Sequence, residues 1–229
     1  MNPPASSVIK VGGSLLGYEE LPTRLKGFLA DFTRPRPILV CGGGDAVELI
    51  REWDRLYTLG EEASHWISLR LLSATAQVLA AMLPEKLEVV ESPAACVASW
   101  ERGLVPVYDP YRFIVDIDER SPDPLPRRWR VTTDTIAARI AERFGASELV
   151  LLKSSSRPET LTMAEAADEG FVDGHFPFAA RNLERVVALN LRRPEDPETV
   201  LVPPDPAAVD PHGSELDETS AELPLPPDD

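Results

Sequence analysis

The chain has 229 residues, with 23 Lys and Arg against 38 Asp and Glu, and a formal net charge of −15. This length suits one globular domain with a sizeable core, and the acidic balance argues against a nucleic-acid partner, which needs a basic patch or stripe. No apolar run reaches the roughly 18 residues of a membrane span. The first residues lack the charged and apolar regions of a signal peptide. The two cysteines, Cys41 and Cys96, lie in apolar stretches, as reduced buried thiols do. We therefore expect a cytoplasmic protein.

The first half of the chain alternates short apolar runs, typical of buried strands, with longer segments of helical period. Strands are predicted over residues 7–11, 37–41, 87–90 and 105–108, and helices over 45–56, 61–83 and 93–102. The helix over 61–83 carries an apolar stripe made of Ile67, Leu71, Ala74, Val78 and Ala81. The alternating letters of residues 111–117 predict one more strand.

The second half continues the same alternation. Thr132 or Thr133 can cap a helix that ends at Gly145. Its predicted buried face consists of Ile136, Ala137, Ile140, Ala141 and Phe144. Strands follow over 148–152 and 185–191. This repeated β-α-β order predicts a mostly parallel sheet with helices on both faces.

The C-terminal segment differs in composition from the rest. Residues 194–229 hold 11 acidic residues, no Lys or Arg, and nine of the 23 prolines. Such a segment buries too little apolar surface to offset its ordering entropy. We expect a folded domain over 1–193 and a tail over 194–229, disordered from residue 203. The tail is either a solubilising extension or an acidic interaction segment.

Glycine loops follow the first two predicted strands. Gly12, Gly13 and Ser14 follow residues 7–11, and a run of three glycines, 42–44, follows 37–41. Glycine lets backbone N–H groups approach an anion closely, and each loop leads toward the N-terminus of a helix. Neither loop has the P-loop or dinucleotide-binding spacing. A tight strand-to-helix turn is the alternative explanation for each loop taken alone.

The order of these features resembles the amino acid kinase superfamily. It consists of Lys-x-Gly-Gly-Ser over 10–14, the glycine run, Val-Thr-Thr-Asp-Thr-Ile-Ala over 131–137, and a strand that ends at Lys153. The resemblance covers about residues 7–193. It implies a three-layer αβα sandwich that transfers the γ-phosphoryl group of ATP, with Mg²⁺ held by ATP phosphates and water. The segments at 63–66, 129–137 and 170–177 are further similar to small kinases of methanofuran-type cofactor assembly in C1 metabolism, which phosphorylate an aminomethylfuran-methanol phosphate.

The resemblance implies three catalytic residues. Lys10 lies at a strand end on the same side as Gly12, as expected of a cation that stabilises the transferred phosphoryl group; the alternative is a lysine that snorkels to water. Asp134 corresponds to the carboxylate that orients this lysine, or it is an acid in the first turn of a helix. Many members carry a second lysine in the segment that corresponds to 169–175, where this chain has none, so Lys153 is the candidate second cation.

The binding residues are assigned in the same way. The nucleotide is expected at Gly12, Gly13, Ser14, Lys153 and Ser154, and the acceptor at Gly42, Gly43, Gly44, Asp45 and Thr133. Several polar residues have two interpretations; the structural one is favoured in each case except the cluster at 127–130, where both stay open. His65 is a packing residue or a ligand, and Arg51 with Arg55 forms a solvated helix face or binds a phosphate. Asp45 and Glu48 are first-turn acids or partners of a substrate ammonium. The cluster at 127–130 is a basic turn or a loop over the substrate. No spacing indicates a structural zinc site.

Three hypotheses follow. The first is an ATP-dependent kinase for a small phosphorylated acceptor, in which Lys10→Ala abolishes turnover with little loss of stability. The second is a catalytically weakened sensor or assembly partner, motivated by the missing lysine. The third is a uridylate or amino-acid kinase. The sequence leaves open whether the protein forms a homo-oligomer, and the helix over 61–83 is the candidate surface for one.

Overall fold

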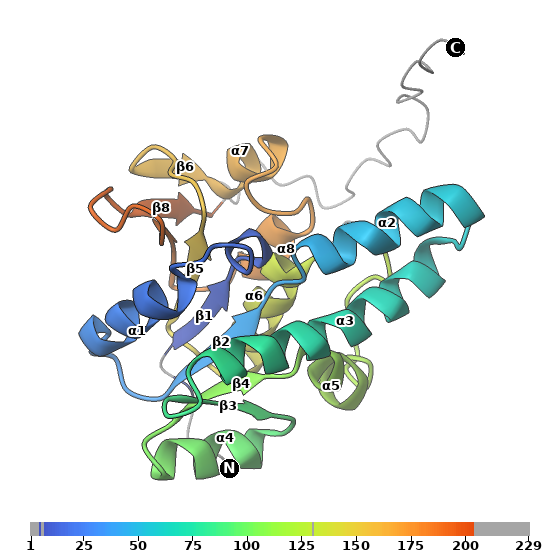
Figure 1. The fold of residues 1–229 in the computed structure, drawn as a ribbon. Coiled ribbons are helices and arrows are strands. Elements are labelled where there is room, and N and C mark those ends of the chain that lie inside the picture. Colours follow the sequence, from blue (N-terminus) through green and yellow to red (C-terminus); the bar gives the residue numbers. More distant parts are fainter. Residues whose placement is uncertain (1–4, 6, 130, 204–229) are drawn as a thin grey trace.

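A computed structural model describes residue 5, residues 7–129 and residues 131–203. The disorder expected of the tail concerns residues that, apart from Pro203, lie outside this part of the chain. The described residues form an eight-stranded sheet of order β3-β4-β2-β1-β5-β7-β8-β6 (Figure 1). The strands are β1 (Ser7–Val11), β2 (Pro37–Cys41), β3 (Leu87–Val90), β4 (Val105–Tyr108), β5 (Glu148–Lys153), β6 (Thr160–Thr162), β7 (Arg185–Asn190) and β8 (Thr199–Val202). All neighbours are parallel except β7 and β8, which confirms the predicted mostly parallel sheet.

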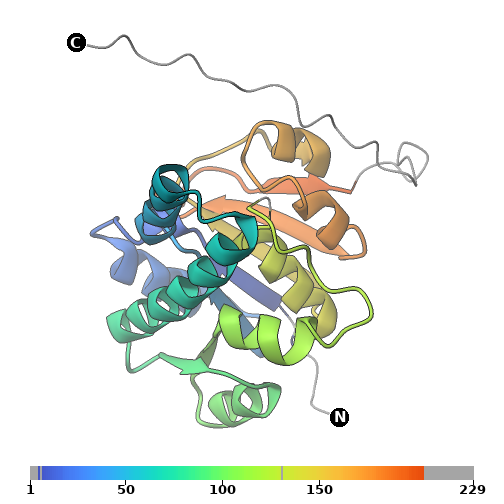
Figure 2. The same cartoon turned by 90° about the vertical axis from the view of Figure 1, so that its right-hand side faces the viewer.

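Helices connect the strands on both faces of the sheet (Figures 1 and 2). They are α1 (Leu21–Asp31), α2 (Asp45–Tyr57), α3 (Glu61–Met82), α4 (Pro93–Glu101), α5 (Pro110–Phe113), α6 (Thr133–Arg143), α7 (Met163–Asp168) and α8 (Phe176–Ala180), with a 3₁₀ turn, η1 (Gly13–Leu15), and a π-helical turn, η2 (Ile114–Asp118). The strand β8 lies beyond residue 193, so the sheet runs past the boundary expected between domain and tail.

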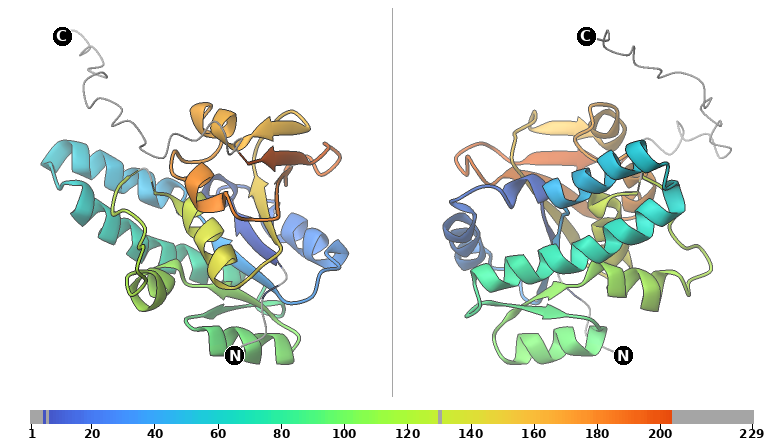
Figure 3. Two further views of the ribbon diagram at one scale, coloured as in Figure 1. Left: turned by 180° about the vertical axis from the view of Figure 1, so that it is seen from behind. Right: turned by 45° about the vertical axis from the view of Figure 1, so that its right-hand side comes forward.

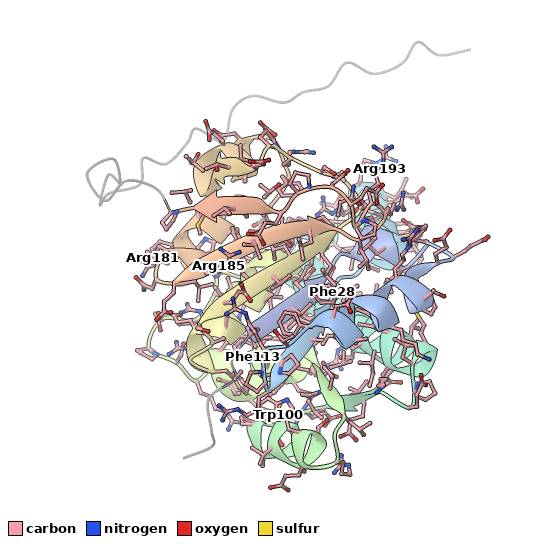
Figure 4. All side chains as sticks on the ribbon, turned by 90° about the vertical axis from the view of Figure 1, so that its left-hand side faces the viewer. Phe28, Trp100, Phe113, Arg181, Arg185 and Arg193 are labelled. Atoms are coloured by element: carbon pink, nitrogen blue, oxygen red, sulfur yellow. The ribbon has the colours of Figure 1, made fainter. Side chains whose placement is uncertain are left out.

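The alternating side chains of β1 divide the core into two parts. Val8 packs with residues of α5, α6 and α8 on one face, whereas Ile9 and Val11 pack with α1 and the C-terminal half of α3 on the other. Figure 4 looks onto this second face, where Phe28 of α1 lies against the sheet.

The strand predicted over residues 111–117 is wrong, because this segment forms α5 and η2. The side chain of Asp109 accepts hydrogen bonds from the N–H groups of Tyr111 and Arg112, at 2.9 and 3.3 Å, and Pro110 occupies the first helical position. A capping acid followed by proline favours a helix start over a strand, despite the alternating letters.

Helix α3 lies beside α2, and the pair extends outward from the body of the molecule (Figures 1 and 3). Its buried face is formed by Leu69, Leu72, Ala76 and Leu79. The apolar stripe noted in the sequence lies on another side of the helix, where Ile67 is 39% and Val78 is 50% exposed. Of the described helices, none has the length and apolar character to cross a membrane.

Candidate active site

The two glycine loops leave the sheet side by side. Val11, the last residue of β1, is paired with Cys41 of β2 and with Leu152 of β5, so the three strands end at one level. The N–H of Gly12 donates to the Leu152 carbonyl at 2.8 Å, and the N–H of Gly42 donates to the Val11 carbonyl at 2.9 Å. These N–H groups continue the sheet, contrary to the expectation that Gly12 donates its N–H to a phosphate.

The backbones of the loops touch where the next glycines meet. A Cβ atom on Gly13 would lie 2.1 Å from the nitrogen of Gly44, closer than real Cβ contacts allow. Gly44 has a φ of 55°, and a Cβ atom there would lie 2.6 Å from the Gly13 carbonyl oxygen. Both positions therefore require glycine for close approach, and Gly44 also requires it for its left-handed backbone conformation.

Three helical turns begin around these loops. The turn η1 starts at Gly13, α2 starts at Asp45, and α6 starts at Thr133, with Thr132 as the N-cap residue. The first N–H groups of a helix have no partner within the helix, and the helix dipole adds positive potential there. The three N-termini together therefore favour an anionic ligand.

Asp134 lies between two lysines. Its Oδ1 is 2.9 Å from Lys10 Nζ in an ion pair, and its Oδ2 accepts a hydrogen bond from Lys153 Nζ at 2.9 Å. The Lys153 ammonium also donates to the carbonyl of Phe171 at 2.6 Å. All three charged side chains are about nine-tenths buried. The carboxylate thus holds two cations from different strands, β1 and β5, at one point.

Burial and charge together set the titration of this cluster. Burial raises the pKa of Asp134, but the charges of Lys10 and Lys153 lower it more, to about 2. Burial lowers the pKa of Lys153 to about 8, against the opposing effect of Asp134. Asp134 is therefore ionised at neutral pH and has little capacity to accept a proton, while Lys153 titrates within the physiological range.

A cavity of about 420 Å³ opens beside this cluster. Eight of the residues expected in the site line it: Gly13, Ser14, Gly43, Gly44, Asp45, Thr133, Asp134 and Lys153. The four other expected residues are not among the lining residues. Lys10 reaches the cavity wall through Asp134, Gly12 and Gly42 continue the sheet, and Ser154 shares a hydrogen bond of 2.9 Å with Ser14 through the two hydroxyl groups.

The far end of the cavity lies between α2 and α3. Glu48, Arg51, His65 and Ser68 line it. Burial lowers the pKa of His65, and the hydroxyl oxygen of Ser68 is buried without a hydrogen-bond partner. Glu48 and Arg51 also form an exposed ion pair of 3.5 Å one turn apart on α2, as the structural interpretation expects, so both interpretations of Glu48, Arg51 and His65 stay predictions.

The segment before α6 contacts both α2 and α3. The guanidinium of Arg51 stacks on the Trp129 ring at 5.2 Å, and the Trp129 indole N–H donates to Asp54 at 2.9 Å. Arg127 pairs with Glu62 at 2.7 Å. Arg127 and Trp129 of the basic cluster therefore contact α3 and α2, and neither is among the residues that line the cavity; residue 130 lies outside the described residues.

Two groups in the site were not predicted from the sequence. One is the Phe171 carbonyl that accepts from Lys153, which no side-chain pattern could reveal. The other is Asp173, whose carboxylate binds the start of α6. The Asp-Gly pair at 173–174 was a usable signal, because aspartate side chains often bond nearby N–H groups.

Comparison with known proteins identifies the family. Residues 6–156 match the model of the amino acid kinase family, which is about two thirds of the chain. The chain belongs to this family. A search of curated proteins gives no match.

Solved structures share its fold. The UMP kinase of Ureaplasma parvum superimposes with a TM-score of 0.62 at 14% identity, covering 87% of this chain and 99% of the other. The UMP kinase of Bacillus anthracis gives 0.60 at 15%, covering 88% and 98%. The aspartate kinase of Synechocystis gives 0.56 at 14%, covering 87% of this chain and 41% of that one. The neighbours agree with the predicted fold, and the family supports a kinase-fold phosphotransferase whose acceptor they leave open.

Proposed function

We propose that the protein transfers the γ-phosphoryl group of ATP to an ionised oxygen of a small phosphorylated acceptor. The acceptor oxygen forms a bond to the γ-phosphorus, the bond from that phosphorus to the β,γ-bridging oxygen breaks, and ADP leaves. The observation that carries the proposal is the meeting of Lys10, Asp134 and Lys153 at the point where three helical turns begin. Phosphoryl transfer depends mainly on such positioning and on positive charge around the γ-phosphate.

Each residue has a role in this proposal. Gly13 and Ser14 offer N–H groups to the ATP phosphates, and Ser154 orients the Ser14 hydroxyl. Lys10 and Lys153 stabilise the charge that develops on the transferred group. Asp134 holds both lysines and leaves the acceptor proton alone, because its pKa is about 2. An acceptor that is already ionised at neutral pH, such as a phosphate or carboxylate, needs no general base.

The acceptor lies, in this proposal, along Gly43, Gly44, Asp45 and Thr133. The finer hypothesis is an aminomethylfuran-methanol phosphate, in the assembly of a methanofuran-type carrier. Asp45 and Glu48 line the cavity and suit an ammonium group on such an acceptor. The described residues include no cluster of three or more His, Cys, Asp or Glu side chains that could hold a metal ion, and Mg²⁺ is proposed to enter with ATP.

The test is ADP release from Mg-ATP in the presence of single acceptors. Aminomethylfuran-methanol phosphate, UMP, aspartate and glutamate are assayed with the wild type, with Lys10→Ala, and with Lys86→Ala, which removes an exposed lysine far from the site in sequence. We expect acceptor-dependent ADP release that falls at least about a hundredfold in Lys10→Ala and stays unchanged in Lys86→Ala. Equal turnover in Lys10→Ala would refute the proposed role of this lysine.

The identity of the productive acceptor separates the hypotheses. ADP release only with UMP or only with an amino acid would refute the furan acceptor but support the kinase activity. Binding of ATP in calorimetry without ADP release from any acceptor would favour the ligand-sensor hypothesis. A structural observation that supports this second hypothesis, besides the missing later lysine, is that Lys153 is already bonded to both Asp134 and the Phe171 carbonyl.

A further inference from the structure

The carboxylate of Asp173 is bonded to the start of the helix that carries Asp134. Its Oδ2 accepts hydrogen bonds from the Thr132 N–H at 3.1 Å, the Thr132 hydroxyl at 2.7 Å and the Thr135 N–H at 3.0 Å. Its Oδ1 accepts from the Thr135 hydroxyl at 2.6 Å and from the N–H of His175 at 3.0 Å. Five donors from two segments therefore converge on one side chain.

The same segment touches Lys153. Two residues before Asp173, the Phe171 carbonyl accepts from the Lys153 ammonium at 2.6 Å, and the Phe171 ring lies 5.0 Å from that nitrogen. Residues 171–173 therefore contact both sides of the ion pair, Lys153 directly and Asp134 through the first turn of α6.

We infer that Asp173 is a positioning residue: it fixes the start of α6 against residues 171–175 and so keeps the Asp134 carboxylate and the Lys153 ammonium aligned for phosphoryl transfer. The part of the inference that concerns phosphoryl transfer rests on the proposed function, whereas the positioning of α6 and Lys153 by Asp173 does not. An asparagine at this position would turn one acceptor oxygen into an NH₂ group that faces N–H and O–H donors. It would also remove a negative charge from the N-terminus of α6, where such a charge is favourable.

The charge of Asp173 also acts on Lys153. Burial lowers the pKa of Lys153, Asp134 of α6 raises it, Lys10 of β1 lowers it, and Asp173 raises it. On the far side of the Phe171 ring, the guanidinium of Arg157 lies 4.7 Å from the ring centre. Loss of the Asp173 charge therefore lowers the pKa of Lys153 and shifts the balance toward its neutral amine.

A test that needs no acceptor follows from the composition, since the chain has only four lysines, at 10, 26, 86 and 153. Protein labelled with [¹³Cε]lysine gives at most four lysine signals, and the Lys153 signal is assigned from its loss in Lys153→Arg. We expect this signal to titrate near pH 8 in the wild type and at lower pH in Asp173→Asn. An unchanged midpoint in folded Asp173→Asn would overturn the inference.

Glu165→Gln is the matched control. Glu165 binds the start of α7, accepting from the Thr162 N–H at 2.9 Å and the Thr162 hydroxyl at 2.7 Å, so the change weakens a similar helix start away from the lysines. Its Lys153 midpoint should equal that of the wild type. If Asp173→Asn does not fold, Thr135→Val removes only the hydroxyl donor to Oδ1. We then expect a displaced Lys153 signal in Thr135→Val, and an unmoved signal would overturn the inference.

Activity supplies the second readout. With a productive acceptor, we expect Asp173→Asn to lower kcat about tenfold or more with a smaller change in the KM for ATP. The reason is that a displaced Lys153 and Asp134 would stabilise the transition state less, while ATP still binds. The basic limb of its pH profile should move to lower pH together with the Lys153 signal. A lower Lys153 titration midpoint in Asp173→Asn without ADP release from any acceptor would refute the proposed function but support the positioning of Lys153 by Asp173. ADP release with unchanged kcat, pH profile and Lys153 signal in Asp173→Asn would remove the inference alone.

Discussion

The Asp134→Asn substitution tests the charge cluster most directly. It keeps the size of the side chain and removes the single negative charge that two buried lysines share. Lys10 and Lys153 then face each other across a neutral amide. Since no other carboxylate pairs with either lysine among the described residues, both cations lose their ion-pair partner at once.

The loss in stability can be estimated from the geometry. Removing one partner of a buried ion pair costs about 3–5 kcal/mol, because the remaining charge stays buried without compensation. The two ammonium groups lie 2.9 Å from oxygens of the same carboxylate, hence within roughly 8 Å of each other. At an effective dielectric constant near 20 they repel each other by about 2 kcal/mol, but this repulsion is also present in the wild type and does not change the difference between the two proteins. A free energy of unfolding lower by about 4 kcal/mol is a large part of the roughly 5–15 kcal/mol of a typical domain.

Denaturant unfolding at pH 7 measures this difference, with Asp116→Asn as the control. Asp116 also bridges two cations, Arg112 at 2.8 Å and Arg120 at 3.6 Å, but on the surface, where a loss below about 1 kcal/mol is expected. A loss of less than 1 kcal/mol in Asp134→Asn would refute the buried-cluster reasoning.

The pH dependence checks the cause of the loss. The folded-state pKa of Lys153 lies at about 8, below its usual value of 10.5, and falls further when Asp134 is neutral. A lysine with a lowered folded pKa makes the folded state more stable as pH rises from that folded value to the unfolded value. In Asp134→Asn this gain in stability begins at lower pH. The difference in free energy of unfolding between the wild type and Asp134→Asn should therefore become smaller as the pH rises to about 8. A difference that widens over this interval would contradict the assignment of the loss to buried positive charge.

Three further outcomes are expected. Gly13→Ala should abolish turnover and lower the free energy of unfolding, measured with denaturant, by about 2 kcal/mol or more, because the new Cβ would lie 2.1 Å from the backbone of the other loop. Gly17→Ala, whose Cβ would have no atom within 4 Å, should leave the stability nearly unchanged. The kcat/KM for ATP should fall above about pH 8 as Lys153 loses its proton, and Lys153→Arg, if active, should lack this limb, as pH profiles from 6 to 10 will show. If the exposed α3 stripe joins two copies, Val78→Glu should shift the protein to monomer in sedimentation while Gln77→Glu does not; equal behaviour of the two would exclude this surface.

The expectation that Lys10→Ala leaves stability almost unchanged is revised by the burial of this residue. The side chains of Lys10 and Asp134 are each only 7% exposed, so the lysine contributes to folding as well as to charge. Lys153 remains as a partner of Asp134 in this variant, and the loss should therefore be smaller than in Asp134→Asn.

Much of the fold could be predicted from the sequence because its central strands are strongly apolar. Six of the eight strands were predicted within a residue or two, and these are the ones rich in Val, Ile and Leu. The strands β6 and β8 were missed: β6 has only three residues, and the apolar run of β8 lies inside the proline-rich acidic segment that was predicted to be a tail. Helix α1 buries only Leu21 and Leu25 and contains a glycine and a proline, which weakened its helical pattern.

The assignment of α3 shows the limit of periodicity. Both the stripe with Ile67 and Val78 and the stripe with Leu69 and Leu79 have helical spacing, and the sequence contains no information on which one faces the sheet. Tertiary packing decides this, because α3 must cover both the sheet and the base of the cavity. The exposed stripe is then an apolar surface that the described part of the chain leaves uncovered.

The position of Lys153 explains how a chain without the expected later lysine can still assemble two cations. Lys10 is paired across the sheet with Leu151 of β5, so the ends of β1 and β5 lie at nearly the same level. A lysine two residues beyond Leu151 has its side chain on the same face of the sheet as Leu151, and Asp134 lies on α6, which packs on that face. Spacing along one strand could indicate Lys153 as the second cation. It could not indicate that a carbonyl and a carboxylate of residues 171–173 hold it there, because those contacts depend on a loop whose path is set by the fold.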